Sequence, residues 1–186
     1  MVRLKTLGAV VLCALPALAG AYQDRSAGVY VEGGAAPFRD GGDDTYSVGA
    51  GLLLPWSPTA GFADGPQSLY WDLFLGNWST RQANDGRSNF AQAGAILNWR
   101  YRFGGGTSPW FGELGIGGSL MDRTYHAASR EFSTTFQFTE VLGVGVSLGD
   151  HGEHEVGLRL QHFSNAGIKE PNPGETFVRA RYTYRF

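Results

Sequence analysis

The chain has 186 residues, which is the size of one domain, and its formal net charge is −2. This balance lacks the basic excess that nucleic-acid-binding domains carry, so no nucleic-acid partner is expected. Glycine (28 residues) and aromatic residues (13%) are abundant, which favours strands and turns over a helical fold.

The start of the chain has the pattern of a secretory signal peptide. Basic residues precede an apolar run over residues 6–18, and small residues follow at 19–21. The apolar run is too short to be a membrane-spanning helix. We therefore expect residues 1–21 to be removed and residues 22–186 to form one exported domain. The only cysteine, Cys13, lies in the signal, so the mature chain would fold without disulfides.

Eight segments of alternating apolar and polar residues follow, separated by clusters of Gly, Asp, Asn, Pro and Ser. No mature segment has the roughly 18 consecutive apolar residues of a spanning helix. In chain order the predicted strands cover residues 26–36, 45–56, 68–79, 89–103, 109–121, 132–148, 154–164 and 176–186. The pattern predicts an all-β fold without a second domain.

The fourth segment shows the alternation most clearly. Its odd-numbered positions from Ala91 to Phe103 are apolar, whereas Gln92, Asn98 and Arg100 lie on the other face, with Ile96 as an exception. Because successive side chains of a strand point to opposite faces, one face of this strand is apolar and aromatic and the other is polar. The last segment repeats this pattern.

The width of an eight-stranded barrel decides which face points inward. Its interior has room for side chains only, so small residues and paired charges can fill it while the aromatic face meets lipid. The predicted internal ion network consists of Asp72, Arg100, Glu113, Arg159 and Arg181. The predicted interfacial aromatic residues are Trp71, Trp99, Tyr101, Trp110 and Tyr184. We predict an eight-stranded antiparallel transmembrane β-barrel, closed because an open edge would leave backbone groups unsatisfied in hydrocarbon.

The C-terminus supports a location in the outer membrane of a Gram-negative bacterium. An alternating aromatic strand that ends on Phe186 resembles the C-terminal signal of bacterial outer-membrane barrels. An even number of strands places both termini on the periplasmic side, with short connections there and longer ones outside. Residues 57–67 are longer than a periplasmic connection should be, which leaves the bounds of the first strands open.

Two reactive residues continue the apolar face of the seventh segment. His162 and Ser164 share the parity of Leu160. Residues two apart on one face are roughly 6–7 Å apart, a gap that an imidazole can bridge to a hydroxyl, as in nucleophile–base pairs for acyl transfer. Polar groups that face lipid are costly, which favours a functional role, although two such residues near a strand end can also simply lie in the headgroup layer. Glu140 interrupts the apolar face of the sixth segment, and the pattern does not explain it.

The residues that follow make the functional interpretation specific. Residues 162–174 read HFSNAGIKEPNPG, which resembles the signature of the lipid A 3-O-deacylase (PagL-type) family over about 25 residues from Arg159 onward. The resemblance implies a serine esterase on the outer wall of an eight-stranded barrel that hydrolyses the 3-position acyl ester of lipid A in lipopolysaccharide. It implies that Ser164 is the nucleophile, that His162 is the general base and that Asn165 and Gly167 supply oxyanion contacts. No cofactor and no metal are expected.

The resemblance also implies a glutamate that orients the histidine. Glu175 is the nearest match and is the predicted third catalytic residue, with Glu170 as the alternative. The family pattern places its acid one residue further on, where this chain has Thr176. Such an offset can be absorbed in a loop, but in a strand it turns the side chain to the other face.

Several alternatives stay open at this point. The chain can be a non-enzymatic structural or adhesive outer-membrane barrel, or a soluble lipid-binding barrel with its aromatic face inside. Lys169 can meet a lipid A phosphate or be a solvated loop charge. A homodimer could cover the polar residues that face lipid. His151 and His154 lack the spacing and the helix of a zinc motif, so they are not predicted to bind metal.

Overall fold

The computed structural model describes residues 22–37, 44–59, 62 and 65–186. The predicted signal peptide, residues 1–21, lies outside the described residues. Among the residues that are described, no helix is long and apolar enough to cross a membrane.

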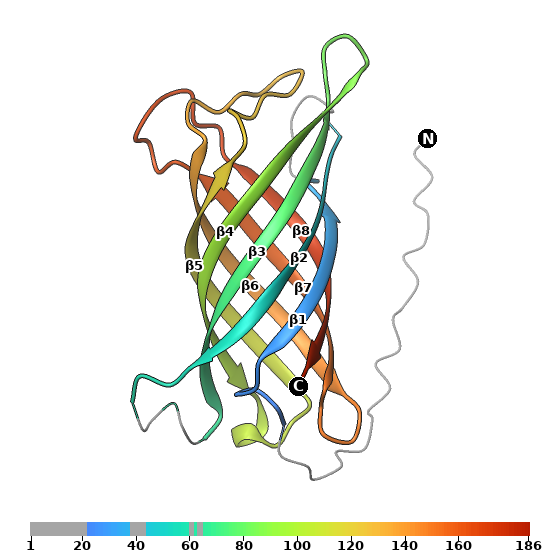
Figure 1. Cartoon of the computed structure of the whole chain (residues 1–186), viewed down its shortest axis with the longest axis vertical. Helices are drawn as coiled ribbons and strands as arrows, with labels where there is room; N and C mark the ends of the chain where they lie inside the picture. Colours follow the sequence, from blue (N-terminus) through green and yellow to red (C-terminus); the bar gives the residue numbers. More distant parts are fainter. Residues whose placement is uncertain (1–21, 38–43, 60–61, 63–64) are drawn as a thin grey trace, which may run out of the picture.

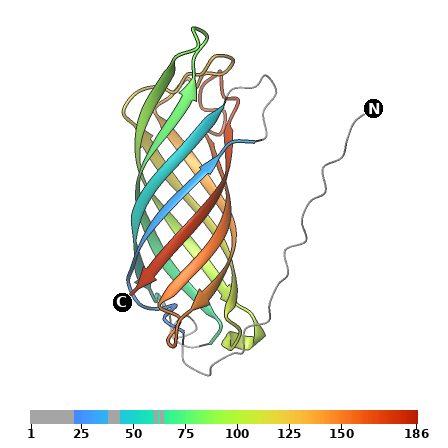
Figure 2. The same cartoon turned by 90° about the vertical axis from the view of Figure 1, so that its right-hand side faces the viewer.

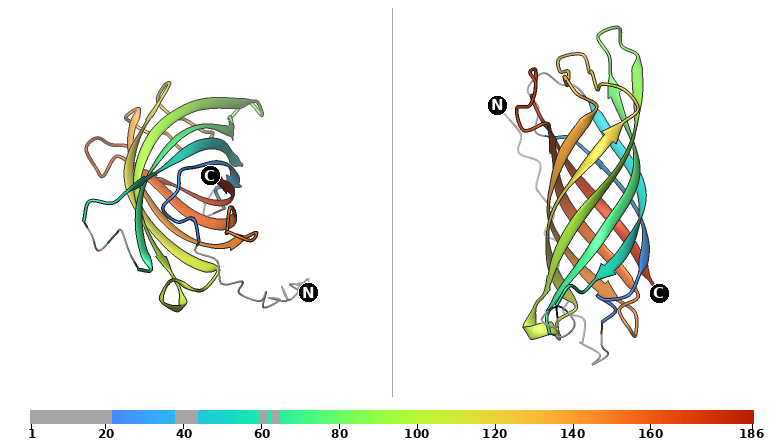
Figure 3. Two further views of the ribbon diagram at one scale, coloured as in Figure 1. Left: turned by 60° about the horizontal axis from the view of Figure 1, so that its bottom comes forward. Right: turned by 60° about the vertical axis from the view of Figure 1, so that its left-hand side comes forward.

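Eight antiparallel strands form a closed barrel in which each strand pairs with its neighbour in sequence and β1 pairs with β8 (Figures 1 and 2). The strands are β1 (Gly28–Ala35), β2 (Thr45–Trp56), β3 (Gln67–Arg81), β4 (Arg87–Arg102), β5 (Trp110–Met121), β6 (Phe136–Leu148), β7 (His154–Ser164) and β8 (Glu175–Arg185). A short 3-10 helix, η1 (Gly104–Gly106), lies in the β4–β5 turn. The barrel end that carries the C-terminus is called the C-terminal end below, and the opposite end the loop end (Figure 3).

The structure confirms the predicted eight-stranded antiparallel barrel. Seven strands begin and end within two residues of the predicted bounds, including the β2 and β3 bounds that residues 57–67 had left open. The sixth strand was predicted to begin at residue 132 but begins at Phe136. The backbone of Phe132 instead donates to the Tyr125 carbonyl within the β5–β6 loop, and its ring is buried inside the barrel. The apolar side chain of Phe132 therefore packs the β5–β6 loop into the barrel and does not begin a strand, as its hydrophobicity had suggested.

The outer surface of the barrel is apolar. Large hydrophobic side chains such as Leu75 and Ile116 are 68% and 64% exposed along the wall. Trp71, Trp110 and Tyr184 point outward near the C-terminal end, as predicted. A soluble lipid-binding barrel would bury these faces, so the structure excludes that alternative. A wall of this kind suits a hydrocarbon environment.

The predicted internal ion network fills the lumen. Asp72 accepts hydrogen bonds from Arg159 at 2.9 Å, from Arg181 at 2.8 Å and from the Tyr30 hydroxyl at 2.6 Å. Closer to the C-terminal end, Arg100 pairs with Glu113 at 2.6 Å. A cavity between these two layers has a volume of only about 10 Å³, which is space for at most one water molecule. Charges paired in this way can be buried, and they leave no channel through this part of the barrel.

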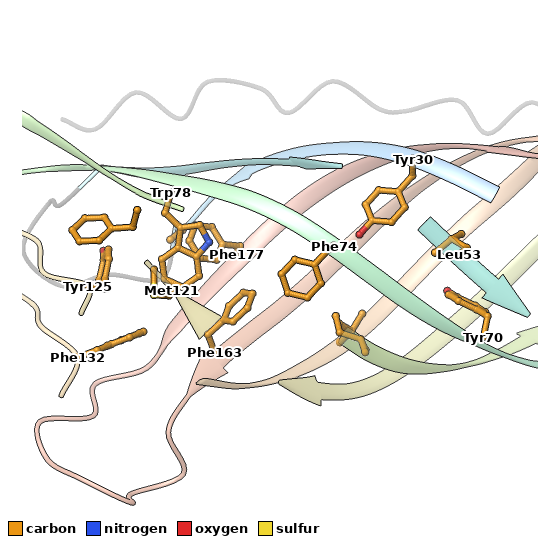
Figure 4. Packing of buried hydrophobic residues seen from close by; sticks show 14 residues of the cluster. Tyr30, Leu53, Tyr70, Phe74, Trp78, Met121, Tyr125, Phe132, Phe163 and Phe177 are labelled. Carbon is orange, nitrogen blue, oxygen red and sulfur yellow. The ribbon is translucent and has the colours of Figure 1, made fainter. Parts of the chain in front are cut away.

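An aromatic cluster fills the lumen toward the loop end (Figure 4). The Trp78 ring packs against the Phe163 and Phe177 rings, with centroid distances of 4.9 and 4.6 Å. The Tyr125 and Phe132 rings from the β5–β6 loop join the same cluster. Phe163 lies between two outward-facing residues of β7, and Phe177 has the same place in β8. These inward-facing side chains therefore anchor the two strands whose outer faces are described next.

Candidate active site

His162 and Ser164 both lie on the outer face of β7, close to its loop end. Both are half-buried, whereas the alternating neighbours Gln161 and Phe163 are buried inside the barrel. The structure thus brings the predicted pair to the outer wall rather than to the lumen, as the strand parity predicted.

The histidine is the middle member of a row across three strands. The register places His162 opposite Glu140 of β6 on one side and opposite Thr176 of β8 on the other. Directly opposed residues in antiparallel strands have Cα atoms about 4.5–5.5 Å apart and project from the same face. Glu140, His162 and Thr176 therefore lie side by side on an otherwise apolar wall, and these three residues are called the polar row below. The alternation along β6 marks Glu140 as an exception, but only the pairing of β6 with β7 places it beside the histidine.

The His162 ring is held by Thr176. The distance between Nδ1 and the Thr176 Oγ1 is 2.8 Å, which is a hydrogen bond. Because Nδ1 is engaged there, Nε2 is the ring nitrogen that remains available to act as a base. Within residues 65–186, no hydrogen bond joins the imidazole to the Ser164 hydroxyl. Hydrogen bonds of catalytic pairs are often long without substrate and tighten when the substrate binds.

The structure does not bring Glu175 to the histidine. Glu175 is the first residue of β8, opposite Phe163, and its side chain is buried on the inner face, where its Oε2 accepts a hydrogen bond from Tyr125 at 3.2 Å. The prediction that Glu175 orients His162 therefore fails on geometry, because the one-residue offset falls within a strand and turns the side chain inward. Glu170 is exposed in the β7–β8 loop and accepts from the Asn172 amide at 2.8 Å.

Asn165 organises the loop that follows the serine. Its buried side-chain amide donates to the Lys169 carbonyl at 2.7 Å and to the Ser133 hydroxyl at 3.1 Å, which ties the β7–β8 loop to the β5–β6 loop. The backbone amide of Asn165 donates to Asn172 Oδ1, and that of Gly167 donates to Asn165 Oδ1, both at 3.0 Å. The two predicted oxyanion residues thus lie next to Ser164, but their amides hold the loop together in this state.

Gly174 closes the loop against the histidine ring. Its φ is +65°, a conformation that glycine adopts without strain. A Cβ at this position would lie 2.7 Å from His162 Cε1 and 3.1 Å from Nε2, and the Gly174 carbonyl accepts from Arg130 at 3.1 Å. The position therefore requires glycine both for its backbone conformation and for space beside the imidazole.

An apolar groove begins immediately below this row on the outer wall. It has a volume of about 390 Å³ and is lined mainly by Leu142, Val144, Leu158, Leu160 and Val178 of β6, β7 and β8. Leu142, Leu160 and Val178 are the next outward-facing residues after Glu140, His162 and Thr176 in the direction of the C-terminal end. The groove can hold an alkyl chain that runs along the barrel wall toward the polar row.

The chain is similar to two curated proteins with known names. Over 95 residues the chain is 42% identical to the lipid A deacylase PagL of Bordetella bronchiseptica, a match that covers 51% of this chain and 50% of that protein. Over 119 residues it is 28% identical to the lipid A deacylase PagL of Pseudomonas aeruginosa, covering 64% and 63%. The chain thus spans about half and just under two thirds of the lengths of these curated relatives.

Solved structures show the same fold. The crystal structure of the outer membrane enzyme PagL superimposes with a TM-score of 0.62 at 24% identity and covers 86% of this chain and 99% of its own. Neisserial surface protein A matches with a TM-score of 0.51 at 12% identity, covering 86% and 97%. The model of the lipid A 3-O-deacylase (PagL) family matches residues 44–185, which include the whole polar row and its groove, and the chain therefore belongs to that family.

Proposed function

We propose that this protein is a lipid A 3-O-deacylase of the Gram-negative outer membrane, a serine esterase that hydrolyses the 3-position acyl ester of lipid A. The observation that carries the proposal is the position of His162 and Ser164, which face outward directly above an apolar groove. The acyl chains of lipid A are already in the bilayer, so a nucleophile on the barrel wall can meet the ester without extraction of the lipid. Family membership and the names of the curated relatives support the same substrate.

Ser164 is the nucleophile in the proposed reaction. Its Oγ attacks the ester carbonyl carbon while Nε2 of His162 accepts the hydroxyl proton. The tetrahedral intermediate collapses as the bond between the acyl carbon and the sugar oxygen breaks, and the imidazolium returns its proton to that oxygen. Water then attacks the acyl-serine with His162 again as the base. The bond between the acyl carbon and Ser164 Oγ breaks, and the imidazolium returns its proton to Oγ, which releases the fatty acid. Every proton that leaves Ser164 or water passes through the same ring nitrogen.

The oxyanion contacts are proposed from the resemblance. Asn165 and Gly167 follow the nucleophile in a turn where Ala166 has a φ of +54° and Gly167 a φ of +76°. Such turns direct successive backbone amides toward one side of the chain. Their amides would exchange the loop hydrogen bonds for the developing oxyanion when the ester is bound.

Mass spectrometry of lipid A tests the proposal. Lipid A from cells that express the wild type should lack one acyl chain, and Ser164→Ala or His162→Ala should restore the full acyl set. Heat-dependent migration on gels should show that all three barrels are folded. Unmodified lipid A in cells that contain the folded wild-type barrel would overturn the enzyme proposal and favour a structural or adhesive barrel.

Two further expectations stay predictions. Removal of residues 1–21 would give a mature chain that begins near Tyr22, which N-terminal sequencing of the protein from the membrane would determine. A homodimer that covers polar groups on the wall is a separate prediction, which cross-linking in the membrane would test.

A further inference from the structure

Glu140 is a carboxylate on a wall that is otherwise apolar. Its side chain is exposed on the outer face of β6, between Phe138 and Leu142 on the same face. Within residues 65–186 its carboxylate makes no hydrogen bond and no ion pair. A charged group that faces lipid is costly, which favours a functional reason for its position.

The residue opposite Glu140 gives the reason for its position. The β6–β7 register pairs Glu140 with His162, so the carboxylate projects from the wall at the same height as the imidazole. The Cβ atoms of such a pair are about 4.5–5.5 Å apart, and a glutamate side chain can cover that distance by a change of rotamer alone. The other neighbour of the ring, Thr176, fixes Nδ1 but carries no charge.

Within residues 65–186, the two glutamates that the resemblance suggested lack this access. Glu175 is on the inner face and bonded to Tyr125, and Glu170 accepts from the Asn172 amide in the loop. Glu140 is therefore the carboxylate that the fold places beside the outward-facing imidazole.

We propose that Glu140 is the positioning carboxylate of this site and that the third catalytic function is divided between two strands. Thr176 holds the ring through Nδ1, and Glu140 stabilises the imidazolium that forms when Nε2 takes the Ser164 proton. Glu140 stays ionised throughout, and in the first step the proton passes from Ser164 to His162 to the sugar oxygen. A neighbouring charge is most effective in a water-poor setting such as this wall. This inference rests on the proposed deacylase function.

Steady-state kinetics of the purified barrel test the inference, with lipopolysaccharide in detergent micelles as substrate. Glu140→Gln should lower kcat by at least about tenfold and leave KM near the wild-type value, because the charge matters for the transition state rather than for binding. Glu140→Asp should recover part of the loss. Glu170→Gln is the matched control, a nearby carboxylate outside the row, and should retain wild-type kcat.

A second variant distinguishes the loss of the carboxylate charge from a structural disturbance of the barrel wall. Thr176→Glu places a carboxylate at the other cross-strand neighbour of His162, so Glu140→Gln combined with Thr176→Glu should regain activity over Glu140→Gln alone. A double variant as slow as Glu140→Gln, when Thr176→Glu alone is active, would overturn the inference. So would a wild-type kcat for Glu140→Gln, or a loss confined to KM. An inactive wild type would instead contradict the proposed deacylase function. An active wild type beside an inactive Ser164→Ala would support that function, and the Glu140 variants then test the role of Glu140 alone.

Discussion

Gly174 lies against the imidazole of His162, and a Cβ at this position would approach Cε1 to 2.7 Å. Gly174→Ala should therefore displace the imidazole ring, because the β7–β8 loop is held in place by hydrogen bonds to the β5–β6 loop. We expect a loss of at least about tenfold in kcat/KM with the barrel still folded, measured on lipopolysaccharide in micelles.

The control for that variant is Gly105→Ala at the C-terminal end. Gly105 has a φ of +66°, nearly equal to that of Gly174, but a Cβ there would meet nothing within 4 Å. It carries the same backbone strain without the contact to the ring and should retain activity. Equal activity of the two variants would show that the imidazole does not need this space.

Thr176→Val removes the hydroxyl that holds Nδ1 and keeps the shape of the side chain. The ring would then be free to rotate away from Ser164, and we expect kcat to fall about tenfold or more with little change in KM. Thr176→Ser retains the hydroxyl and should retain most of the activity. A wild-type kcat for Thr176→Val would mean that the 2.8 Å contact does not orient the base.

The lumen network predicts an effect on stability far from the site. Asp72→Ala removes the carboxylate that Arg159 and Arg181 contact at 2.9 and 2.8 Å and leaves them with Glu32, which already pairs with Arg179, so we expect a cost of about 3–5 kcal/mol of unfolding free energy. The exposed pair of Asp122 and Arg123 provides the comparison, and Asp122→Ala should cost no more than about 1 kcal/mol. Urea unfolding of the refolded barrel in lipid vesicles measures both, and equal costs would contradict the role assigned to the buried network.

The buried carboxylate of Asp24, at the C-terminal end of the barrel, should make the free energy of unfolding depend on pH. Burial by itself raises the pKa of Asp24, but the hydrogen bond from Arg102 and the nearby charges of Arg100 and Arg102 hold its pKa below the ordinary value of 3.8. A lowered pKa in the folded state means that the carboxylate stabilises the barrel above pH 3.8 and that this contribution is lost as the pH falls through the folded-state value. The stability difference between the wild type and Asp24→Asn should be full at pH 7 and shrink in acid. A constant difference across this range would refute the assignment.

Local alternation made the barrel predictable from the sequence. In β4, for example, the parity of Trp99 and Arg100 assigns every neighbouring residue to the wall or the lumen, and even the exception, Ile96, is buried inside on the parity of Arg100. The same parity placed His162 and Ser164 outside. Such assignments depend only on residues close together in sequence, which a period of two relates directly.

The partners of the histidine depend on register between strands, which local alternation does not contain. Glu175 matched the resemblance by residue type, yet one position along β8 was enough to turn it into the lumen and leave Thr176 beside the ring. Glu140 could be recognised as anomalous, but its pairing with His162 across β6 and β7 required the fold. The buried Phe132 shows the same limit, since its partner Trp78 is distant in the chain.

The packed interior of the barrel has a consequence for the route of substrate and product in the proposed reaction. With ion pairs and the aromatic cluster around Trp78 occupying the lumen, the proposed substrate would reach Ser164 at the outer face of the wall and not through the barrel interior. Encounters with substrate then depend on the number of molecules per unit of membrane area rather than on their concentration in solution. Dilution of lipopolysaccharide with inert detergent at constant bulk concentration should slow the reaction accordingly.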